Sequence, residues 1–454
     1  MNVSLQKQNL PQISYPQGAP VTRQIQEDEF LAFAYDRLNH QPIACFLDSA
    51  GPIGPRSQHA MLSGAPIGLF FQYSDKVVWL NLRDQSRAEI TIPQFDTWLT
   101  RFNQLGLGPN GPALFPLITY EAFNPWVRHS RPHPLWRQAP ATWLLTADIW
   151  RYDRQTQRLT GCPEPDPPQV SWDAPLPSPA KPGWRETEAE YFHKIDHVQK
   201  DIYNGVYYQA NLSQRFLTHS ERRPLETYTT LRKLNPSPFM GLFKCGEAWV
   251  VSGSPERLVD KNRAHISARP IAGTKPRFKN DPTRDQASQQ ELLLSPKERA
   301  EHLMLVDLIR NDLGRVAAPG SVSVDEFCVI ETYSHVHHLV SQVNASLRED
   351  ATVYQLIASM FPGGTITGAP KISCIQRLSQ LEEEARGPYT GAIGYIDTHH
   401  RLDLNILIRT LIQVGDQVCF HAGGGIVADS IHGSEYEETR HKCMALMEAL
   451  GIRC

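Results

Sequence analysis

Residues 421–442 read HAGGGIVADSIHGSEYEETRHK, and our interpretation of the chain starts from this stretch. An apolar segment leads into three consecutive glycines, 423–425. Consecutive glycines allow the backbone to come close to a ligand and to offer its N–H groups as hydrogen-bond donors. The stretch therefore predicts a ligand-binding loop that follows a strand.

A helix should follow the glycines. Ser434 and Glu437 have the spacing of a capping box, which predicts that the helix begins there. On that helix Glu435, Glu438 and Lys442 would share one face. A solvated face with an internal salt bridge would show the same pattern, so this helix alone does not define a site.

The same arrangement recurs upstream, at residues 295–298, SPKE. This second capping box, with proline at the first helical position, predicts a helix over residues 296–313. Glu298 and Glu301 lead a stripe of that helix which is otherwise apolar. Carboxylates that point toward a core need a cation or hydrogen-bond donors. Because all these ligands are oxygen atoms, the two glutamate pairs suit Mg²⁺ rather than Zn²⁺.

The composition is that of an ordinary globular protein. The 454 residues suffice for one large domain or two, with 41% hydrophobic and 20% charged residues. The net charge of −3 gives no electrostatic case for a nucleic-acid partner. No apolar run approaches the roughly 20 residues of a membrane span, and the first residues lack a signal-peptide core. The eight cysteines form no CxxC pair, so we expect reduced thiols and a cytoplasmic protein.

Short apolar runs between turn signals predict strands in the first part of the chain. Residues 163–182 contain eight prolines and predict a linker. We therefore divide the chain into an N-terminal region (1–162), a linker (163–184) and a C-terminal domain (185–450). Blocks of strands separated by helices favour an α+β fold with antiparallel sheets. The predicted strands of the first part lie at residues 43–47, 67–71, 77–82, 114–119 and 142–149.

Residues 363–371, GGTITGAPK, do not match a phosphate-binding loop, because the lysine does not directly follow the last glycine. A loop that binds another anion, or a plain tight connection, remains open. The sequence also contains no G-x-S-x-G or G-x-C-x-G motif, so it offers no nucleophile elbow.

Two groups of polar residues stand out on predicted strands. Alternation along a strand points His338 away from His335 and His337, so the three imidazoles cannot hold one ion. Arg409 lies in an apolar strand predicted over residues 404–411. A buried guanidinium needs a carboxylate partner, and a substrate carboxylate would serve.

Several motifs together resemble those of the chorismate-utilising enzymes. The resemblance covers roughly residues 185–450. Residues 1–160 resemble only loosely the N-terminal region of the large subunits of anthranilate synthase and aminodeoxychorismate synthase. The motifs are SPER (254–257), PIAGT (270–274), KERAEHLMLVDLIRNDLGRV (297–316), HHLVS (337–341), FPGGTITGAPK (361–371), GAIGY (391–395), IRT (408–410), and AGGGIVADS with EYEET (422–439).

The resemblance implies two packed antiparallel sheets with helices outside. It also implies a catalytic domain over residues 185–450, in which a Mg²⁺ ion binds the ring carboxylate of chorismate. It implies that Glu301 and Glu438 bind the metal, with Glu298 and Glu435 beside them. Glu256 of the SPER motif would protonate the departing C4 hydroxyl group. The substrate carboxylates would be bound by Arg409, Tyr395, Gly423, Gly424 and Lys442. The ring would be lined by Gly273, Thr274, Thr365 and His338.

Gln209 separates the branches of the family. Members that add water carry lysine at this strand position, whereas members that add ammonia carry glutamine. Gln209 therefore indicates an aminating member. The motifs YYQANLSQRF (207–216), DLIRNDLGRV, FPGGTITGAPK and GGGIVADS and the modest length look like aminodeoxychorismate synthase component I, in para-aminobenzoate and folate biosynthesis. The PIAGT motif and residues 235–240, NPSPFM, look more like anthranilate synthase component I, which is the alternative.

Many aminodeoxychorismate synthases carry, at the position of Ala272, a lysine that attacks C2 of chorismate. The alanine argues against a covalent route in this chain, and Lys275 is no obvious substitute. An inactive chorismate-fold binding or regulatory subunit is a further alternative. The intact Glu256, Glu301 and Arg409 argue against it.

Two partners besides chorismate follow from the resemblance. None of the eight cysteines lies in a G-x-C-x-G elbow, so glutamine use would need a separate glutamine amidotransferase subunit that supplies ammonia. We also expect a pocket for tryptophan in the N-terminal region. Its residues would be Leu47, Ser49, Pro238 and Met240.

Overall fold

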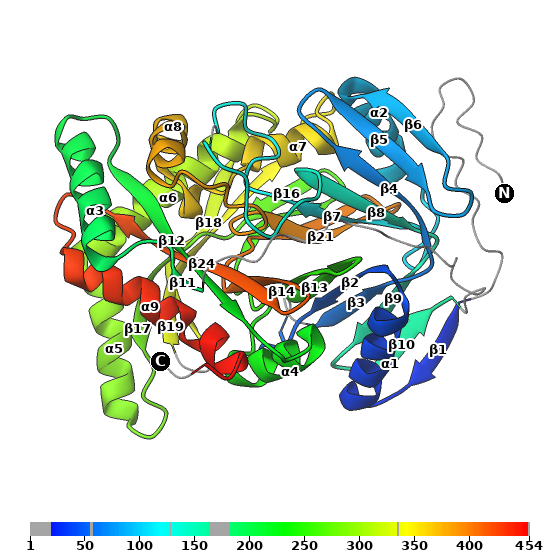
Figure 1. Ribbon diagram of the computed structural model, residues 1–454, viewed down its shortest axis with the longest axis horizontal. Helices are drawn as coiled ribbons and strands as arrows, with labels where there is room; N and C mark the ends of the chain where they lie inside the picture. The colour runs from blue at the N-terminus through cyan, green and yellow to red at the C-terminus, as the bar shows by residue number, and fades with distance from the viewer. Residues whose placement is uncertain (1–19, 55–57, 128, 163–181, 334–335, 453–454) are drawn as a thin grey trace.

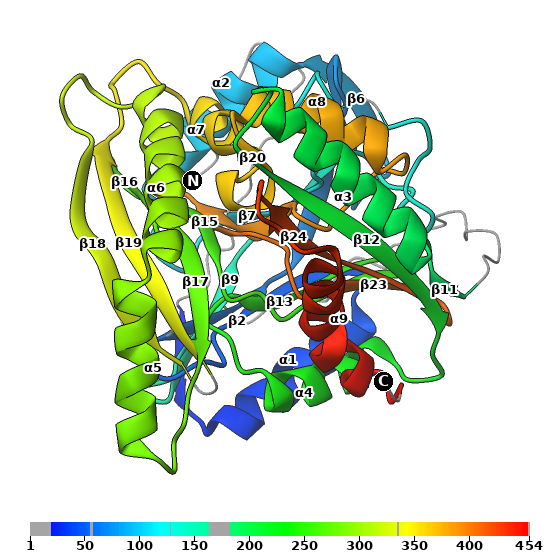
Figure 2. The ribbon, with the colours of Figure 1, turned by 90° about the vertical axis from the view of Figure 1, so that its left-hand side faces the viewer.

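The structure, a computed structural model, describes residues 20–54, 58–127, 129–162, 182–333 and 336–452. Two large antiparallel sheets lie face to face, with helices on both outer sides (Figures 1 and 2). The predicted α+β fold of two packed antiparallel sheets is confirmed. Most of the Pro-rich segment, residues 163–181, lies outside the described residues, as does His335.

The first sheet has the strand order β1-β10-β9-β3-β2-β13-β14-β23-β24-β12-β11, with β20 beside β12. Its strands are β1 (Val21–Gln24), β2 (Ile43–Asp48), β3 (His59–Ser63), β9 (Ile149–Asp153), β10 (Arg158–Gly161), β11 (Gly183–Trp184), β12 (Gln209–His219), β13 (Met240–Cys245), β14 (Ala248–Ser252), β20 (Gly368–Ala369), β23 (Thr410–Val414) and β24 (Gln417–Ile426).

The second sheet has the order β17-β19-β16-β15-β22-β21-β7-β8-β4-β5-β6, with β18 beside β19. Its strands are β4 (Pro66–Gln72), β5 (Lys76–Asn81), β6 (Arg87–Thr91), β7 (Ala113–Ile118), β8 (Ala141–Thr146), β15 (Arg257–Asn262), β16 (His265–Ala268), β17 (Ile271–Pro276), β18 (Ser323–Thr332), β19 (Val336–Ser346), β21 (Ala392–Asp397) and β22 (Arg401–Asn405).

Each sheet combines strands from both sides of the Pro-rich segment. In the first sheet β2 pairs with β13, and in the second sheet β7 pairs with β21. Side chains such as Leu144 and Phe243 fill the space between the sheets. The residues before and after the Pro-rich segment therefore build one common core.

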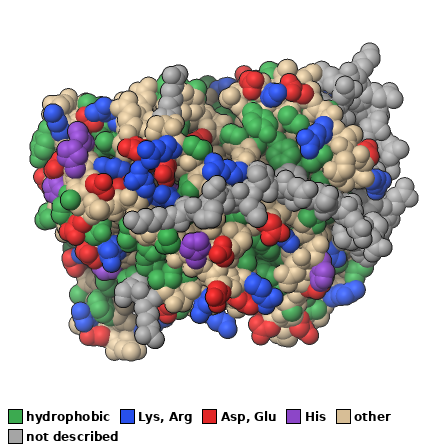
Figure 3. Space-filling model, in the orientation of Figure 1, with side chains coloured by type: hydrophobic (Ala, Val, Ile, Leu, Met, Phe, Trp, Pro, Cys, Tyr) green, Lys and Arg blue, Asp and Glu red, His purple; other side chains and the backbone are tan. Residues whose placement is uncertain are grey.

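Helices cover the outer faces. α2, α6 and α7 pack on the second sheet, whereas α1, α4 and α9 pack on the first. Acidic and basic side chains are interspersed over the face shown in Figure 3. None of the helices in the described ranges is long and apolar enough to cross a membrane. The helices are α1 (Glu27–His40), α2 (Ile92–Asn103), α3 (Glu188–Tyr203), α4 (Pro224–Leu234), α5 (Pro282–Leu294), α6 (Pro296–Gly314), α7 (Val353–Met360), α8 (Lys371–Leu381), α9 (His432–Ala449) and the 3-10 turn η1 (Gly364–Ile366).

Two apolar runs that we predicted as single strands are each two strands. The run 142–149 contains β8 and the start of β9, and the run 404–411 contains the end of β22 and the start of β23. In both cases the chain crosses from the second sheet to the first. The crossing passes through the buried interior, so hydrophobicity does not fall where the strand ends. Arg409 lies in the second crossing with φ 51°, not within a strand.

One predicted helix start is confirmed and one is wrong. α6 begins after Ser295, whose Oγ accepts the backbone N–H of Glu298 at 3.3 Å. α9 begins at His432, so Ser434 lies inside its first turn and does not cap it. Ser430 holds the turn before α9 instead, because its hydroxyl donates to Glu435 Oε1 at 2.7 Å.

Candidate active site

Four carboxylates meet where α6 and α9 approach the end of β24. Burial and the negative charges of Glu298, Glu435 and Glu438 raise the pKa of Glu301. A Cβ atom at Gly424 would lie 3.3 Å from Glu435 Oε2 and 3.6 Å from Glu438 Oε1. The two glutamate pairs predicted from separate helices therefore form one cluster beside the glycine run.

The cluster fits a divalent cation. Four carboxylates repel one another unless positive charge lies between them. Lys442 supplies part of that charge, because its ammonium group lies 2.7 Å from Glu438 Oε1 and donates to the Gly423 carbonyl at 2.9 Å. Carboxylate oxygens are the ligands that Mg²⁺ prefers. The donor set of this chain is thus suited to Mg²⁺.

Glu256 is a buried carboxyl group with a pKa near 7. It follows β14, and only 6% of its surface is exposed. Burial raises its pKa to about 7, although Thr365, Arg409 and Lys442 each lower it. The Thr365 hydroxyl donates to Glu256 Oε1 at 2.9 Å. An acid with this pKa can give up a proton and take it back at neutral pH.

Thr274 and His338 face each other on the paired strands β17 and β19. Thr274 Oγ1 lies 2.9 Å from His338 Nδ1. Burial, and then the positive charge of Arg409, lower the pKa of His338 to about 4, so the imidazole is neutral. Gly273 has φ +72°, and a Cβ atom there would lie 2.7 Å from Glu298 Oε2. Glycine therefore allows β17 to touch the acidic end of α6.

Arg409 is a half-buried cation in the crossing between the two sheets. Burial lowers its pKa, and Glu256 opposes this effect. Its Nη1 donates to the neutral Asn235 Oδ1 at 3.3 Å. A carboxylate bound here would complete the charge balance of the guanidinium.

The three glycines let groups pack against both faces of β24. Whereas Gly424 faces the glutamates of α9, a Cβ atom at Gly425 would lie 2.0 Å from Gln209 Nε2. A Cβ atom at Gly423 would lie 2.7 Å from Asn211 Oδ1. A larger residue would displace Asn211 from position 423, crowd Glu435 at position 424 and displace Gln209 from position 425, which explains the consecutive glycines.

Comparison with known proteins agrees with this geometry. The model of the chorismate binding enzyme family matches residues 71–448. The chain belongs to this family. The match crosses the Pro-rich segment, as do both sheets.

Two curated relatives carry different names. The chain is 44% identical over 266 residues to aminodeoxychorismate synthase component 1 of Bacillus subtilis (strain 168), covering 59% of this chain and 56% of the relative. It is 44% identical over 271 residues to anthranilate synthase component 1 of Aquifex aeolicus (strain VF5), covering 59% and 55%. The chain thus spans little more than half the length of these relatives. Their names do not separate the two reactions.

Solved structures extend the similarity to nearly the whole chain. Anthranilate synthase component I from Streptococcus pneumoniae TIGR4 superposes with a TM-score of 0.74 at 25% identity, covering 91% of this chain and 97% of that one. MenF, the menaquinone-specific isochorismate synthase from Escherichia coli, gives a TM-score of 0.69 at 17% identity, covering 96% and 95%. The second similarity shows the fold alone.

Tyr395 does not lie with the other residues that the family resemblance assigned to the substrate. It lies on β21 and lines a cavity of about 190 Å³ together with all four residues of the predicted tryptophan pocket, Leu47, Ser49, Pro238 and Met240. The guanidinium of Arg151 lies 5.3 Å from the ring of Tyr395. Tyr395 therefore faces the cavity of the predicted tryptophan pocket.

Sequence reasoning overlooked Tyr389, which precedes the GAIGY motif. Its ring stacks on His421 at 5.0 Å between centroids, and His421 is two residues before Gly423. The signal was a second tyrosine beside the same motif. Sequence spacing alone does not show whether Tyr389 or Tyr395 faces the glycine run.

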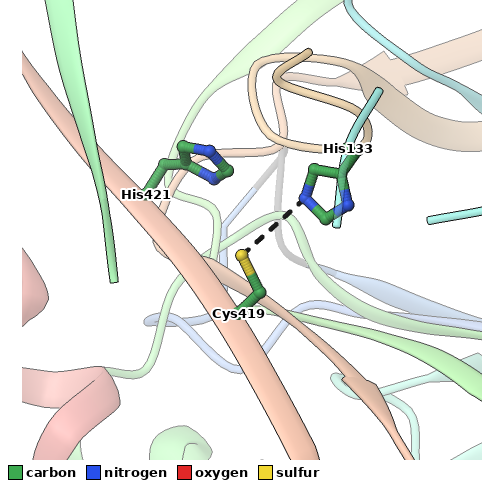
Figure 4. Close-up of side chains that lie close together, drawn as sticks. All are labelled: His133, Cys419 and His421. Atoms are coloured by element: carbon green, nitrogen blue, oxygen red, sulfur yellow. Dashed lines mark hydrogen bonds between the residues drawn. The ribbon is translucent and has the colours of Figure 1, made fainter. Parts of the chain in front are cut away.

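Among the described residues, His133, Cys419 and His421 form the group of potential metal ligands whose ligand atoms all lie within 4.8 Å of one another (Figure 4). No three of the four described glutamates of the acidic cluster lie this close together. His133 Nδ1 accepts the backbone N–H groups of Leu135 and Trp136, at 3.1 and 2.8 Å. Its proton is therefore on Nε2, which lies 3.8 Å from Cys419 Sγ. Burial raises the pKa of Cys419 to about 12, so the thiol is neutral. A cation bound here would have to displace the protons of both groups.

We predict that Glu256 titrates with a pKa of about 7, because burial disfavours its charged form. The infrared carboxyl band that is lost in Glu256→Gln should disappear as pH rises through this value. Thr365→Val removes a donor that favours the carboxylate, so the pKa should rise further. Thr365→Ser keeps the donor and serves as the matched control. If the carboxyl band of Thr365→Val disappeared at the same pH as that of the wild-type protein, this would contradict the assigned hydrogen bond.

Proposed function

We propose that this chain aminates chorismate at C4 with ammonia, forming 4-amino-4-deoxychorismate and water in a Mg²⁺-dependent reaction. The reaction would serve para-aminobenzoate and folate biosynthesis. The observation that supports it most strongly is the acid Glu256, with its pKa near 7, placed beside Thr365 and near the positive charges of Arg409 and Lys442. Gln209 at the glycine run supports amination rather than hydration, given the family resemblance.

The charged residues would bind and orient the substrate. Arg409 and Lys442 would pair with its carboxylates, and the backbone N–H groups of residues 423 and 424 would donate to them. Glu301 and Glu438, with Glu298 and Glu435 beside them, would hold Mg²⁺. When bound, this ion would draw electrons from the ring through the carboxylate.

Glu256 would supply the proton that the C4 hydroxyl needs to leave as water. Gln209 would orient the nucleophile. Ala272 offers no amino group, so the first addition at C2 would use water or ammonia instead of an enzyme lysine. As this nucleophile adds at C2, the C4–O bond would break and the hydroxyl would leave as water. Ammonia would then form the C4–N bond while the group at C2 leaves, so the proton lost by each incoming group balances the proton given to each leaving group. The carboxyl group of Glu256 returns to its protonated form.

Anthranilate synthase activity is the second candidate. It is favoured by Ala272 and by the cavity that joins Leu47, Ser49, Pro238 and Met240. In this reaction ammonia would remain at C2, and the product would become anthranilate. The two proposals use the same site residues. They differ in the carbon atom that keeps the nitrogen, C4 in the first and C2 in the second.

A product assay separates these functions. We expect chorismate, Mg²⁺ and ammonium chloride to give 4-amino-4-deoxychorismate, detected by chromatography. Glutamine alone should not replace ammonium, because the chain lacks an amidotransferase cysteine motif; adding a class I glutamine amidotransferase subunit should restore glutamine use. Fluorescent anthranilate would establish the second candidate. Unconsumed chorismate would indicate an inactive binding subunit, whereas turnover of glutamine by the chain alone would exclude the separate subunit.

Glu301→Gln and Glu438→Gln should each lower Mg²⁺-dependent turnover by roughly a thousandfold, because each removes one carboxylate ligand of the proposed cation. Glu437→Gln is the matched control, since this exposed side chain lies on the same helix. Circular dichroism and thermal unfolding should show that all three variants remain folded. Near-normal activity of either cluster variant at low Mg²⁺ would exclude these glutamates as ligands.

We also propose that tryptophan occupies the cavity at Leu47, Ser49, Pro238 and Met240. The cavity combines apolar walls with charged groups, including the Arg257–Asp403 ion pair at 2.7 Å. Calorimetric titration should show binding, or acid-denatured protein should release tryptophan. Leu47→Trp should fill the cavity and abolish binding without lowering the unfolding temperature by more than a few degrees. Wild-type protein that neither binds nor releases tryptophan would refute the proposal.

A further inference from the structure

His302 is a polar residue in an otherwise largely apolar seam. The buried side chains of α6 recur at helical spacing through His302, Leu305, Val306, Ile309 and Leu313. His302 is fully buried, with 0% exposure. A leucine would continue the stripe, whereas a buried imidazole costs free energy unless it is hydrogen-bonded. The imidazole of His302 therefore requires a hydrogen-bond partner within the protein.

That partner is Ser341 on β19. His302 Nε2 lies 2.6 Å from Ser341 Oγ, and both side chains are fully buried. The same oxygen accepts the backbone N–H of Cys328 at 3.0 Å. Cys328 has φ +53° at an irregularity in the pairing of β18 with β19. One serine hydroxyl thus joins α6, β19 and a strained residue of β18.

The contact lies next to the acidic cluster. Glu301 precedes His302 directly, and Glu298 lies one turn before it on α6. The anchoring strand β19 also carries His338, whose partner Thr274 lies on β17. Figure 2 shows α6 beside β17, β18 and β19. The bond therefore joins the helix that bears two glutamates to the strands that bear the candidate ring-lining residues.

The four carboxylates also oppose this arrangement. Repulsion from Glu435 and Glu438 on α9 acts on the same end of α6 that carries Glu298 and Glu301. Before a cation binds, this repulsion favours movement of α6 away from α9. A hydrogen bond one residue from Glu301 holds the helix against it. Burial lowers the pKa of His302 to about 4, so the ring adds no positive charge at neutral pH.

We propose that His302 and Ser341 form a positioning pair that holds the acidic end of α6 at the distance required for one divalent cation to join the glutamates of α6 and α9. The pair acts through Glu298 and Glu301 and does not touch the cation. The inference rests on the proposed function, because it assumes that the four glutamates bind a divalent cation.

The test compares cation affinity with fold stability, using Mn²⁺ as the probe in the full chain. His302→Leu keeps the seam apolar but removes the hydrogen bond. Calorimetry and electron paramagnetic resonance should show Mn²⁺ affinity lowered roughly 10- to 100-fold, as for other residues that orient metal ligands. Thermal unfolding in EDTA should change little. His302→Gln, which can still reach Ser341 Oγ, should recover part of the affinity.

A double-mutant cycle identifies the contact. Ser341→Ala should weaken Mn²⁺ binding as His302→Leu does, and the double variant should bind no more weakly than either single variant. Leu303→Ala is the matched control, because this neighbouring side chain is 55% exposed. Unchanged affinity in His302→Leu, or additive losses in the double variant, would overturn the positioning role. A wild-type chain that binds no Mn²⁺ would overturn the proposed metal role, and the positioning role with it.

Discussion

The buried ion pair between Arg386 and Glu382 is the contact on which the rest of the site depends. Arg386 is 1% exposed and binds both carboxylate oxygens of Glu382 at 2.7 Å. It also donates to the carbonyls of Asn211 on β12 and Ile366 on η1, and stacks on Tyr120 at 4.6 Å. One guanidinium therefore fixes the strand of Gln209, the turn of Thr365 and the N-terminal region relative to one another.

The site places its carboxyl groups in two different environments. The four glutamates lie at the α6 and α9 side of β24, whereas Glu256 lies with Thr365 and Arg409 near the crossing between the sheets. Burial raises the pKa of Glu256 to about 7, whereas the pKa of Glu301 is raised by burial and by the negative charges of the other cluster glutamates. Acid catalysis and cation binding can therefore use the same residue type in one site, because burial and neighbouring charges differ between the two places.

The sequence predicted those parts of the site that depend on local periodicity. The helix 296–313, the glutamate pairs and the glycine run follow from spacing and capping, and the structure brings them together. Arg409, predicted as a buried charge within a strand, is half-buried and lies between β22 and β23. Uninterrupted hydrophobicity hides the crossing between the sheets at this point. The start of α9 was misplaced because Ser430, four residues earlier, holds the turn by a contact that no local motif encodes. The place of Tyr395 depends on which sheet its strand joins, and that is set by pairing with residues far away in the chain.

The mixed composition of the two sheets affects how the chain can fold during synthesis. Ile118 on β7 pairs with Ala392 on β21, so the hydrophobic faces of β4 to β8 leave the ribosome long before the strand that completes their sheet. At cellular synthesis rates this delay is on the order of tens of seconds. During that time an incomplete sheet edge is open to pairing with other chains. The nascent protein is therefore a natural client for chaperones that shield exposed strands until translation ends.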